Sequence, residues 1–149
     1  MTFKQKIYNH YQQALNERIK ALQQVLSDLK ESGSNETKST AGDKHETALA
    51  MLQIEQANVR GQLKELMDQK IVFEKIDPTV SSVVIVNGSL VKTNRGYLFL
   101  SIAAAKAIID GNTVIALSPQ SPLGIKLVGL GVADIAAVNN TRYVIESFE

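Results

Sequence analysis

The sequence predicts an α+β fold: an antiparallel hairpin of two helices over residues 1–75, followed by a compact β-rich domain with one short helix over residues 76–149. Two observations lead to this division. All three prolines and most of the valine and isoleucine fall after residue 75. Apolar residues recur at helical spacing before this point, whereas short apolar runs separated by turn residues follow it. The 149 residues suffice for a short helical module and one compact domain.

A heptad pattern predicts each helix of the hairpin. From Phe3 to about Glu31 no proline interrupts the chain, and apolar residues follow the 4-3 spacing of a coiled-coil seam at Leu15, Ile19, Leu22, Leu26 and Leu29. The second seam has one polar interruption, Gln56, and consists of Leu49, Leu52, Gln56, Val59, Leu63 and Leu66. Residues 32–42 between the seams are rich in Ser, Gly, Asn and Thr and predict a loop. Two helices of similar length with a polar connection favour an antiparallel coiled coil.

The second half has the signals of short strands and turns. Apolar runs predict strands over residues 83–86, 90–92, 97–102, 114–117 and 143–145. Asn87-Gly88 is a strong turn signal between the first two runs. Ser121 followed by Pro122 predicts the cap and first residue of a short helix over 123–128.

Composition excludes several classes of protein. Cysteine is absent, which excludes disulfide scaffolds and thiolate metal sites. The net charge of +1 provides no bulk field toward nucleic acid or membrane, and no apolar run reaches the ~20 residues of a membrane span. We expect a cytoplasmic monomer without a membrane partner. No phosphate loop, catalytic triad or metal-binding histidine pair is present, so we do not expect an independent enzyme.

The most informative segment is Gly42-Asp43-Lys44-His45-Glu46-Thr47-Ala48 at the start of the second helix. Asp43 and Glu46 have the spacing of a capping box, in which both carboxylates bind free backbone N–H groups. They also have the spacing of neighbours on one helix face, and Mg²⁺ is commonly held by one or two carboxylates together with water and substrate oxygens. From the residues alone both interpretations remain open.

This segment resembles the hairpin-tip signature Gly-Asp-x-x-Glu-Asn-Ala of the Gre transcript-cleavage factors. Gly42, Asp43, Glu46 and Ala48 match it, and Thr47 replaces the Asn. The second half is similar to the FKBP-like C-terminal domain of that family, with Ala133 where the family usually has Gly. The matching residues there are Ser118, Ser121-Pro122-Leu123-Gly124, Leu127-Val128-Gly129, Asp134 and Tyr143-Val144-Ile145.

The resemblance implies a factor that binds bacterial RNA polymerase and inserts its coiled-coil tip into the secondary channel. Asp43 and Glu46 would then act inside the polymerase active site, where they would help to hold a Mg²⁺ ion shared with the polymerase. Two metal ions close together can activate water and stabilise the leaving oxygen. The expected outcome is cleavage of the nascent RNA 3′ end in backtracked complexes, catalysed by the polymerase.

The sequence leaves three alternative functions open. The first is a non-cleaving regulator or inhibitor that binds the same channel, favoured somewhat by Thr47 and by the long polar segment 32–42. The others are an FKBP-like peptide-binding or prolyl isomerase module and a plain coiled-coil dimeriser. Basic side chains on the helices could line a path for RNA if they cluster in space, although exposed charges are usually only solvated; they are Lys4, Lys6, Arg18, Lys20, Arg60 and Lys64.

Overall fold

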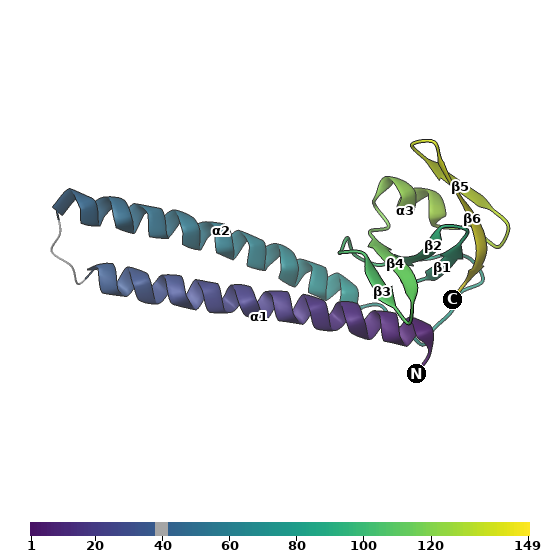
Figure 1. The fold of residues 1–149 in the computed structure, drawn as a ribbon, viewed down its shortest axis with the longest axis horizontal. Coiled ribbons are helices and arrows are strands. Elements are labelled where there is room, and N and C mark those ends of the chain that lie inside the picture. The colour runs from purple at the N-terminus through teal and green to yellow at the C-terminus, as the bar shows by residue number, and fades with distance from the viewer. Residues whose placement is uncertain (38–41) are drawn as a thin grey trace. The chain divides into compact units, whose positions relative to one another are not determined.

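The computed structural model describes residues 1–37 and 42–149, with the side chains of residues 35–45 left out of the description. The chain forms two compact units. One, the sheet unit, consists of Met1–Gln12 and Ile71–Glu149, and the other, the hairpin unit, of Gln13–Lys70. The predicted α+β class is confirmed, because two long helices precede a mixed sheet and a short helix (Figure 1). The domain boundary at residue 75 stays a prediction.

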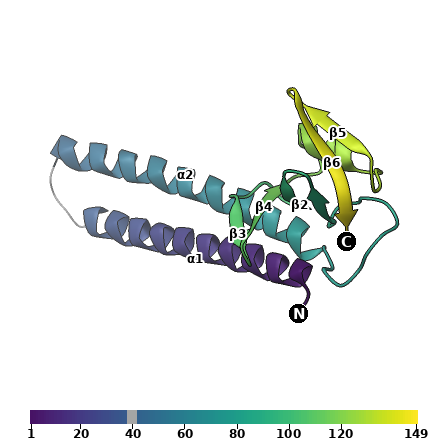
Figure 2. The ribbon, with the colours of Figure 1, turned by 45° about the vertical axis from the view of Figure 1, so that its right-hand side comes forward.

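Helix α1 (Phe3–Thr37) and helix α2 (Gly42–Glu74) run antiparallel through the hairpin unit (Figures 1 and 2). The prediction of a loop over residues 32–42 was wrong for residues 32–37, which continue α1. Gly33 is half-buried at the next 4-3 position after Leu29. The continuing seam and one added backbone hydrogen bond per residue outweigh the weak helix propensity of Ser, Gly and Asn.

The heptad seams determine which side chains the hairpin unit buries. Leu15 and Ile19 of α1 are buried, as are Val59, Leu63 and Leu66 of α2. The remaining seam positions are half-buried, namely Leu22, Leu26, Leu29, Leu49, Leu52 and Gln56. Burial along the seam therefore decreases toward residues 37 and 42, where the helices meet the connection.

The sheet unit is built on six strands in the order β3-β4-β2-β1-β6-β5. Strands β2 and β4 pair in parallel, and every other neighbouring pair is antiparallel. The strand bounds are β1 (Leu90–Thr93), β2 (Gly96–Leu100), β3 (Ala107–Ile109), β4 (Asn112–Leu117), β5 (Ile135–Val138) and β6 (Thr141–Phe148). The short helix α3 (Pro122–Leu127) follows β4.

Strand β2 separates two buried layers, because successive side chains of a strand point to opposite faces. Leu98 and Leu100 belong to a core cluster that also contains Leu127 of α3; its other members are Ile85, Val91, Leu117, Ala136 and Ile145. Phe99 lies between these two residues in the sequence, is fully buried, and points to the opposite face of the strand, toward α1 and α2. Its ring centroid lies 6.2 Å from that of Phe73 and 6.3 Å from that of Tyr11. The start of α1 and the end of α2 are thus part of the core of the sheet unit.

The predicted strand over residues 83–86 was wrong. This segment is irregular, and its regular backbone pairing is limited to Ile85, which donates to Leu130 O and accepts from Gly129 N. The Ile85 side chain is fully buried, whereas Val83 is 93% exposed. β-Propensity reflects packing on a paired, half-buried surface, and both edges of β1 are already occupied by β2 and β6.

No helix in the part of the chain that the structure describes combines the length and the apolar character needed to cross a membrane.

Candidate functional site

The two predicted tip carboxylates belong to the first two turns of α2. Gly42 begins the helix, so Asp43 is its second residue, but the Asp43 side chain lies outside the described residues. Glu46 is described, and its side chain is exposed. Positions three apart are neighbours on a helix surface, so the backbone places both residues on one face. Carboxylates in this position also interact favourably with the helix dipole.

Seam packing places this turn at the end of a long helical element. Residues 13–37 of α1 span about 37 Å at the rise of an α-helix. Between Thr37 and Gly42 only four residues connect the helices. The connection is therefore shorter than the predicted eleven-residue loop, which removes the length argument that had favoured an inhibitor.

Glu46 is the one residue of the predicted pair whose side chain can be assessed as a metal ligand. Among the described residues, no three His, Cys, Asp or Glu side chains come together in a way that could hold an ion. A pair of carboxylates can fill only part of an octahedral Mg²⁺ shell. Glu46 fits such a half-site because its side chain is exposed.

Three of the basic residues proposed to line an RNA path, Lys4, Lys6 and Lys64, are held by other groups of the chain. Lys4 is only 3% exposed, and its Nζ donates to the backbone oxygens of Val80 and Glu149 at 2.9 and 3.1 Å. Burial lowers the pKa of Lys4, and the nearby acidic groups Glu149 and Asp77 oppose this shift. The Lys4 hypothesis was therefore wrong, since this ammonium group anchors α1 in the sheet unit.

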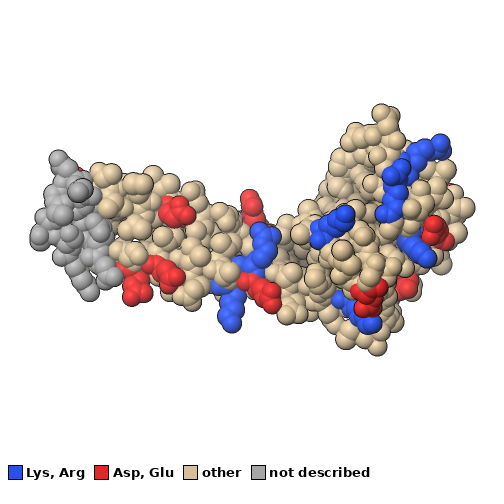
Figure 3. Space-filling model, viewed as in Figure 1, with Lys and Arg blue, Asp and Glu red and all other residues tan. Residues whose placement is uncertain are grey.

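Two further basic side chains of this set form ion pairs with carboxylates. Lys6 forms an ion pair with Asp110 at 2.9 Å, and Lys64 forms one with Asp68 at 3.1 Å. On the face seen in Figure 3, the part of the hairpin nearest the grey residues shows only acidic side chains, and basic and acidic side chains lie together further along. Exposed pairs of this kind contribute about 0–1 kcal/mol each. This face shows no basic stripe of the sort that tracks a nucleic-acid backbone.

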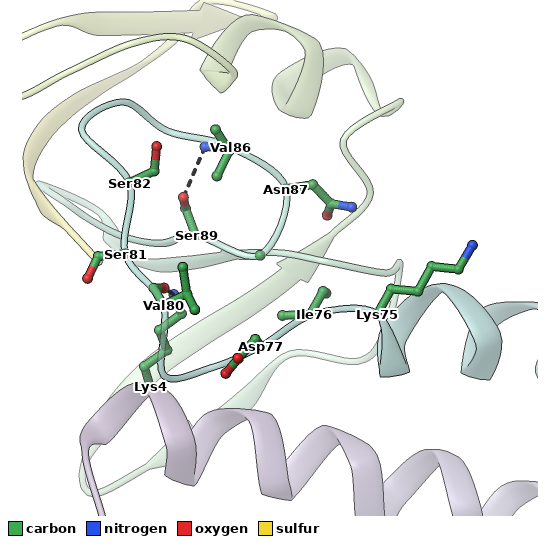
Figure 4. A pocket seen from close by; sticks show the side chains of 11 residues that line it. Lys4, Lys75, Ile76, Asp77, Val80, Ser81, Ser82, Val86, Asn87 and Ser89 are labelled. Carbon is green, nitrogen blue, oxygen red and sulfur yellow. Dashed lines mark hydrogen bonds between the residues drawn. The ribbon is translucent and has the colours of Figure 1, made fainter.

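A pocket of about 260 Å³ lies in the sheet unit, under the loop that joins α2 to β1 (Figure 4). Its walls combine Lys4 and Asp77 with apolar and hydroxyl side chains; the remaining lining residues are Lys75, Ile76, Val80, Ser81, Ser82, Val86, Asn87, Gly88 and Ser89. Some of the polar groups bind the backbone of the loop itself. Asp77 accepts from Thr79 N at 2.9 Å, and Ser89 Oγ accepts from Val86 N at 3.0 Å. Asp77 and Ser89 thus bind the backbone of the loop that lines the pocket.

The motif residues of the second half hold the backbone around α3. Ser121 caps the helix by accepting from Gly124 N at 3.1 Å. A Cβ on Gly124 would clash with the carbonyl oxygen of Ser118. Gly129 has a φ of +88°, a conformation that favours glycine. Asp134 accepts from Gly131 N at 2.8 Å.

Ala133 also has a positive φ, of 73°. This explains structurally why a glycine suits the position, because only glycine adopts that conformation without steric cost. The second-half motif is therefore a set of fold determinants. Any chemistry that the resemblance implies rests on the tip of the hairpin.

No family model and no curated protein matches the sequence. Among solved structures, that of the transcription factor Gfh1 is similar over 91% of this chain and 90% of its own, with 16% sequence identity and a TM-score of 0.37. A superposition this loose supports no inference about the present chain.

Proposed function

We propose that this protein is a Gre-type transcription elongation factor, which binds bacterial RNA polymerase and stimulates cleavage of backtracked RNA. The observation that carries the proposal is the segment Gly42-Asp43-x-x-Glu46-x-Ala48 at the turn of a two-helix hairpin. In the proposed action the hairpin enters the secondary channel, and the tip carboxylates reach the polymerase active site. The chain itself is not an enzyme, since the polymerase performs the hydrolysis.

The hairpin suits insertion into a water-filled channel. Nearly every residue of α1 between positions 20 and 34 that lies off the seam is exposed, and most of these residues are polar or charged. The apolar seam of α1 faces inward, whereas α2 also exposes Met51, Ile54 and Met67. Glu46, exposed near the tip, is free of core packing.

Bound Mg²⁺, held jointly with the polymerase, would supply activation of the attacking water. Asp43 and Glu46 would contribute two carboxylates to its shell and orient them from one helix face. Negative charge near the start of a helix interacts favourably with the helix dipole. Affinity for the polymerase would come from other surfaces, because two carboxylates alone bind the ion weakly.

The second candidate function is a non-cleaving regulator that occupies the same channel. One observation favours it: Thr47 stands where the tip signature has Asn. An FKBP-like C-terminal fold, the monomeric state and a cytoplasmic location remain predictions under both functions.

RNA cleavage in a stalled, backtracked polymerase complex tests the proposal. The protein is expected to accelerate cleavage, and Asp43→Asn and Glu46→Gln should each abolish the acceleration with polymerase affinity retained. Glu55→Gln is the matched control, since Glu55 is an exposed carboxylate of the same helix, more than two turns further on. If the pair only caps α2, Asp43→Asn should instead remain active, because Asn caps a helix as well as Asp does, and Asp43→Ala should lose about 0.5–2 kcal/mol of stability. A native protein that binds polymerase and slows RNA synthesis without cleavage would establish the regulator.

A further inference from the structure

Asn87 and Gly88 form the only Asn-Gly pair in the sequence. In such a pair the backbone nitrogen of the glycine attacks the side-chain amide of the asparagine. A bond forms between Gly88 N and Asn87 Cγ, the bond from Cγ to Nδ2 breaks, and ammonia leaves with the proton of Gly88 N. Water then opens the succinimide ring at either carbonyl, which gives aspartate or isoaspartate. Glycine favours the reaction because it has no Cβ to hinder the attack.

The structure places this pair at the centre of a tight turn. Ser89 N donates to Val86 O at 3.0 Å, which closes a four-residue β-turn. Gly88 has a φ of +96°, and the φ of Asn87 is negative. These signs define a type II turn, in which ψ of the first central residue is positive. Closure of the succinimide ring requires a negative ψ at the asparagine, so the turn keeps Asn87 Cγ away from Gly88 N.

The nitrogen that would attack is also engaged elsewhere. Gly88 N donates to Leu100 O at 2.6 Å. The attack requires this nitrogen to lose its proton, and the hydrogen bond holds the proton in place. Gly88 is buried, and a Cβ built on it would lie 3.1 Å from Ile76 Cγ2, so the backbone has little room on that side.

Further hydrogen bonds hold the turn against the rest of the sheet unit (Figure 4). Ser89 Oγ accepts from Val86 N at 3.0 Å, and Ser89 O accepts from Leu100 N at 3.0 Å. Ser89 itself is only 1% exposed. The Asn87 side chain, by contrast, is exposed to water. The reactive amide is thus accessible and its nucleophile is not, so the reaction has to wait until the turn opens.

We propose that Asn87 is a latent modification site: the folded turn protects it, and it converts to aspartate or isoaspartate when the turn opens. Isoaspartate lengthens the main chain by one methylene group and adds a negative charge, so it does not fit the type II turn. Because the reaction is slow compared with opening and closing, its rate follows the fraction of molecules in which the turn is open. This inference does not depend on the proposed function.

Mass spectrometry of the peptide that contains Asn87, after incubation at mildly alkaline pH, measures the conversion. A synthetic peptide of residues 83–91 in the same buffer gives the rate of the unprotected pair. In the full-length native protein the conversion should be slower by about tenfold or more. In the protein unfolded by urea it should approach the rate of the peptide. Equal rates in the native protein and the peptide would overturn the inference.

Ser89→Ala tests whether the turn itself gives the protection. The substitution removes the hydroxyl that accepts from Val86 N and leaves the Asn-Gly pair unchanged. It should raise the deamidation rate of the folded protein several-fold. Ser82→Ala is the matched control, because it makes the same change at a half-buried position of the same loop outside the turn, and it should leave the rate unchanged. A folded Ser89→Ala protein that deamidates at the native rate would contradict the protective role of the turn.

Amide hydrogen exchange tests the same point in the native protein without any substitution. The N–H of Gly88, bound to Leu100 O, should exchange much more slowly than the N–H of Gly111, an exposed glycine between β3 and β4. In Ser89→Ala, exchange at Gly88 and deamidation at Asn87 should both become faster, because both require release of the same N–H. Exchange at Gly88 as fast as at Gly111 in the native protein would overturn the inference.

Discussion

The sheet unit and the hairpin unit bury their side chains in different ways. In the sheet unit, fully buried residues come from segments far apart in the sequence, such as Ile7, Phe73, Phe99 and Ile145. In the hairpin unit, all buried residues among those described lie on two regular stripes. The comparison teaches that periodicity suffices to build an element with one seam. A core with two layers depends on contacts between residues far apart in the sequence, which local sequence patterns do not predict.

The largest difference between the units should appear when one core side chain is removed from each. Phe73 is fully buried, with its ring stacked on Tyr8 at 4.6 Å between centroids. Phe73→Ala should cost about 3–5 kcal/mol of unfolding free energy. Leu52→Ala, on the half-buried seam, should cost about 1–2 kcal/mol. Urea unfolding followed by circular dichroism measures both, and equal losses would contradict the contrast.

Substitution of one glycine by alanine in each unit should give effects of opposite sign. At Gly124 the new Cβ would clash with the Ser118 carbonyl oxygen, whereas at Gly61 it would meet nothing within 4 Å. We expect Gly124→Ala to lose about 1–3 kcal/mol or more. Gly61→Ala should gain about 0.5–1 kcal/mol from helix propensity. Thermal denaturation of both variants is the measurement, and a destabilised Gly61→Ala would show an unrecognised contact in the hairpin.

The contact between α1 and the sheet should make stability depend on pH in the alkaline range. Burial raises the pKa of Tyr11 above its ordinary value of 10.0. Above that pH the unfolded chain loses this proton while the folded protein keeps it, so the Tyr11 contribution to stability falls as pH rises. In the Tyr11→Phe variant this decrease in stability with rising pH should be absent.

At pH 7, Tyr11→Phe should be less stable than the native protein by ~1 kcal/mol, because the hydroxyl donates to Ala105 O at 2.9 Å. The difference in unfolding free energy between the native protein and Tyr11→Phe should become smaller above pH 10.0. Lys4 acts in the opposite direction, since its lowered pKa makes stability rise as pH approaches 10.5. Urea unfolding from pH 7 to 11 gives the unfolding free energy of the native protein and of Tyr11→Phe as a function of pH. The difference between the two curves is the contribution of Tyr11, and parallel curves would contradict the prediction.

The smallest effect is expected at Val83. This side chain is 93% exposed in the loop of the sheet unit, although its neighbour Ile85 is fully buried. Val83→Ser should change the free energy of unfolding by less than about 0.5 kcal/mol, whereas Ile85→Ala should cost about 2–5 kcal/mol. A large loss in Val83→Ser would indicate that the segment 83–86 pairs as a strand in solution.

Several features were predictable because neighbours in the sequence encode them. The two heptad seams predicted which residues of the hairpin unit are buried, and Ser121-Pro122 predicted the cap and first residue of α3. Strand β1 and the turn at Asn87-Gly88 also agree with the sequence signals. For the candidate site, the sequence placed Asp43 and Glu46 at the start of the second helix. Their action on RNA stays a prediction, and the Asp43 side chain lies outside the described residues.

The local pattern follows from the sequence, because helix, seam, turn and cap each depend on residues a few positions apart. Which distant segments share a core is visible only in the folded protein. It placed Lys4 against backbone oxygens 76 and 145 residues away, paired β2 in parallel with β4, and left 83–86 outside the sheet. The physical reason is that the environment of a lysine or a valine depends on whether a distant partner occupies the space beside it. Propensity carries no information about that partner.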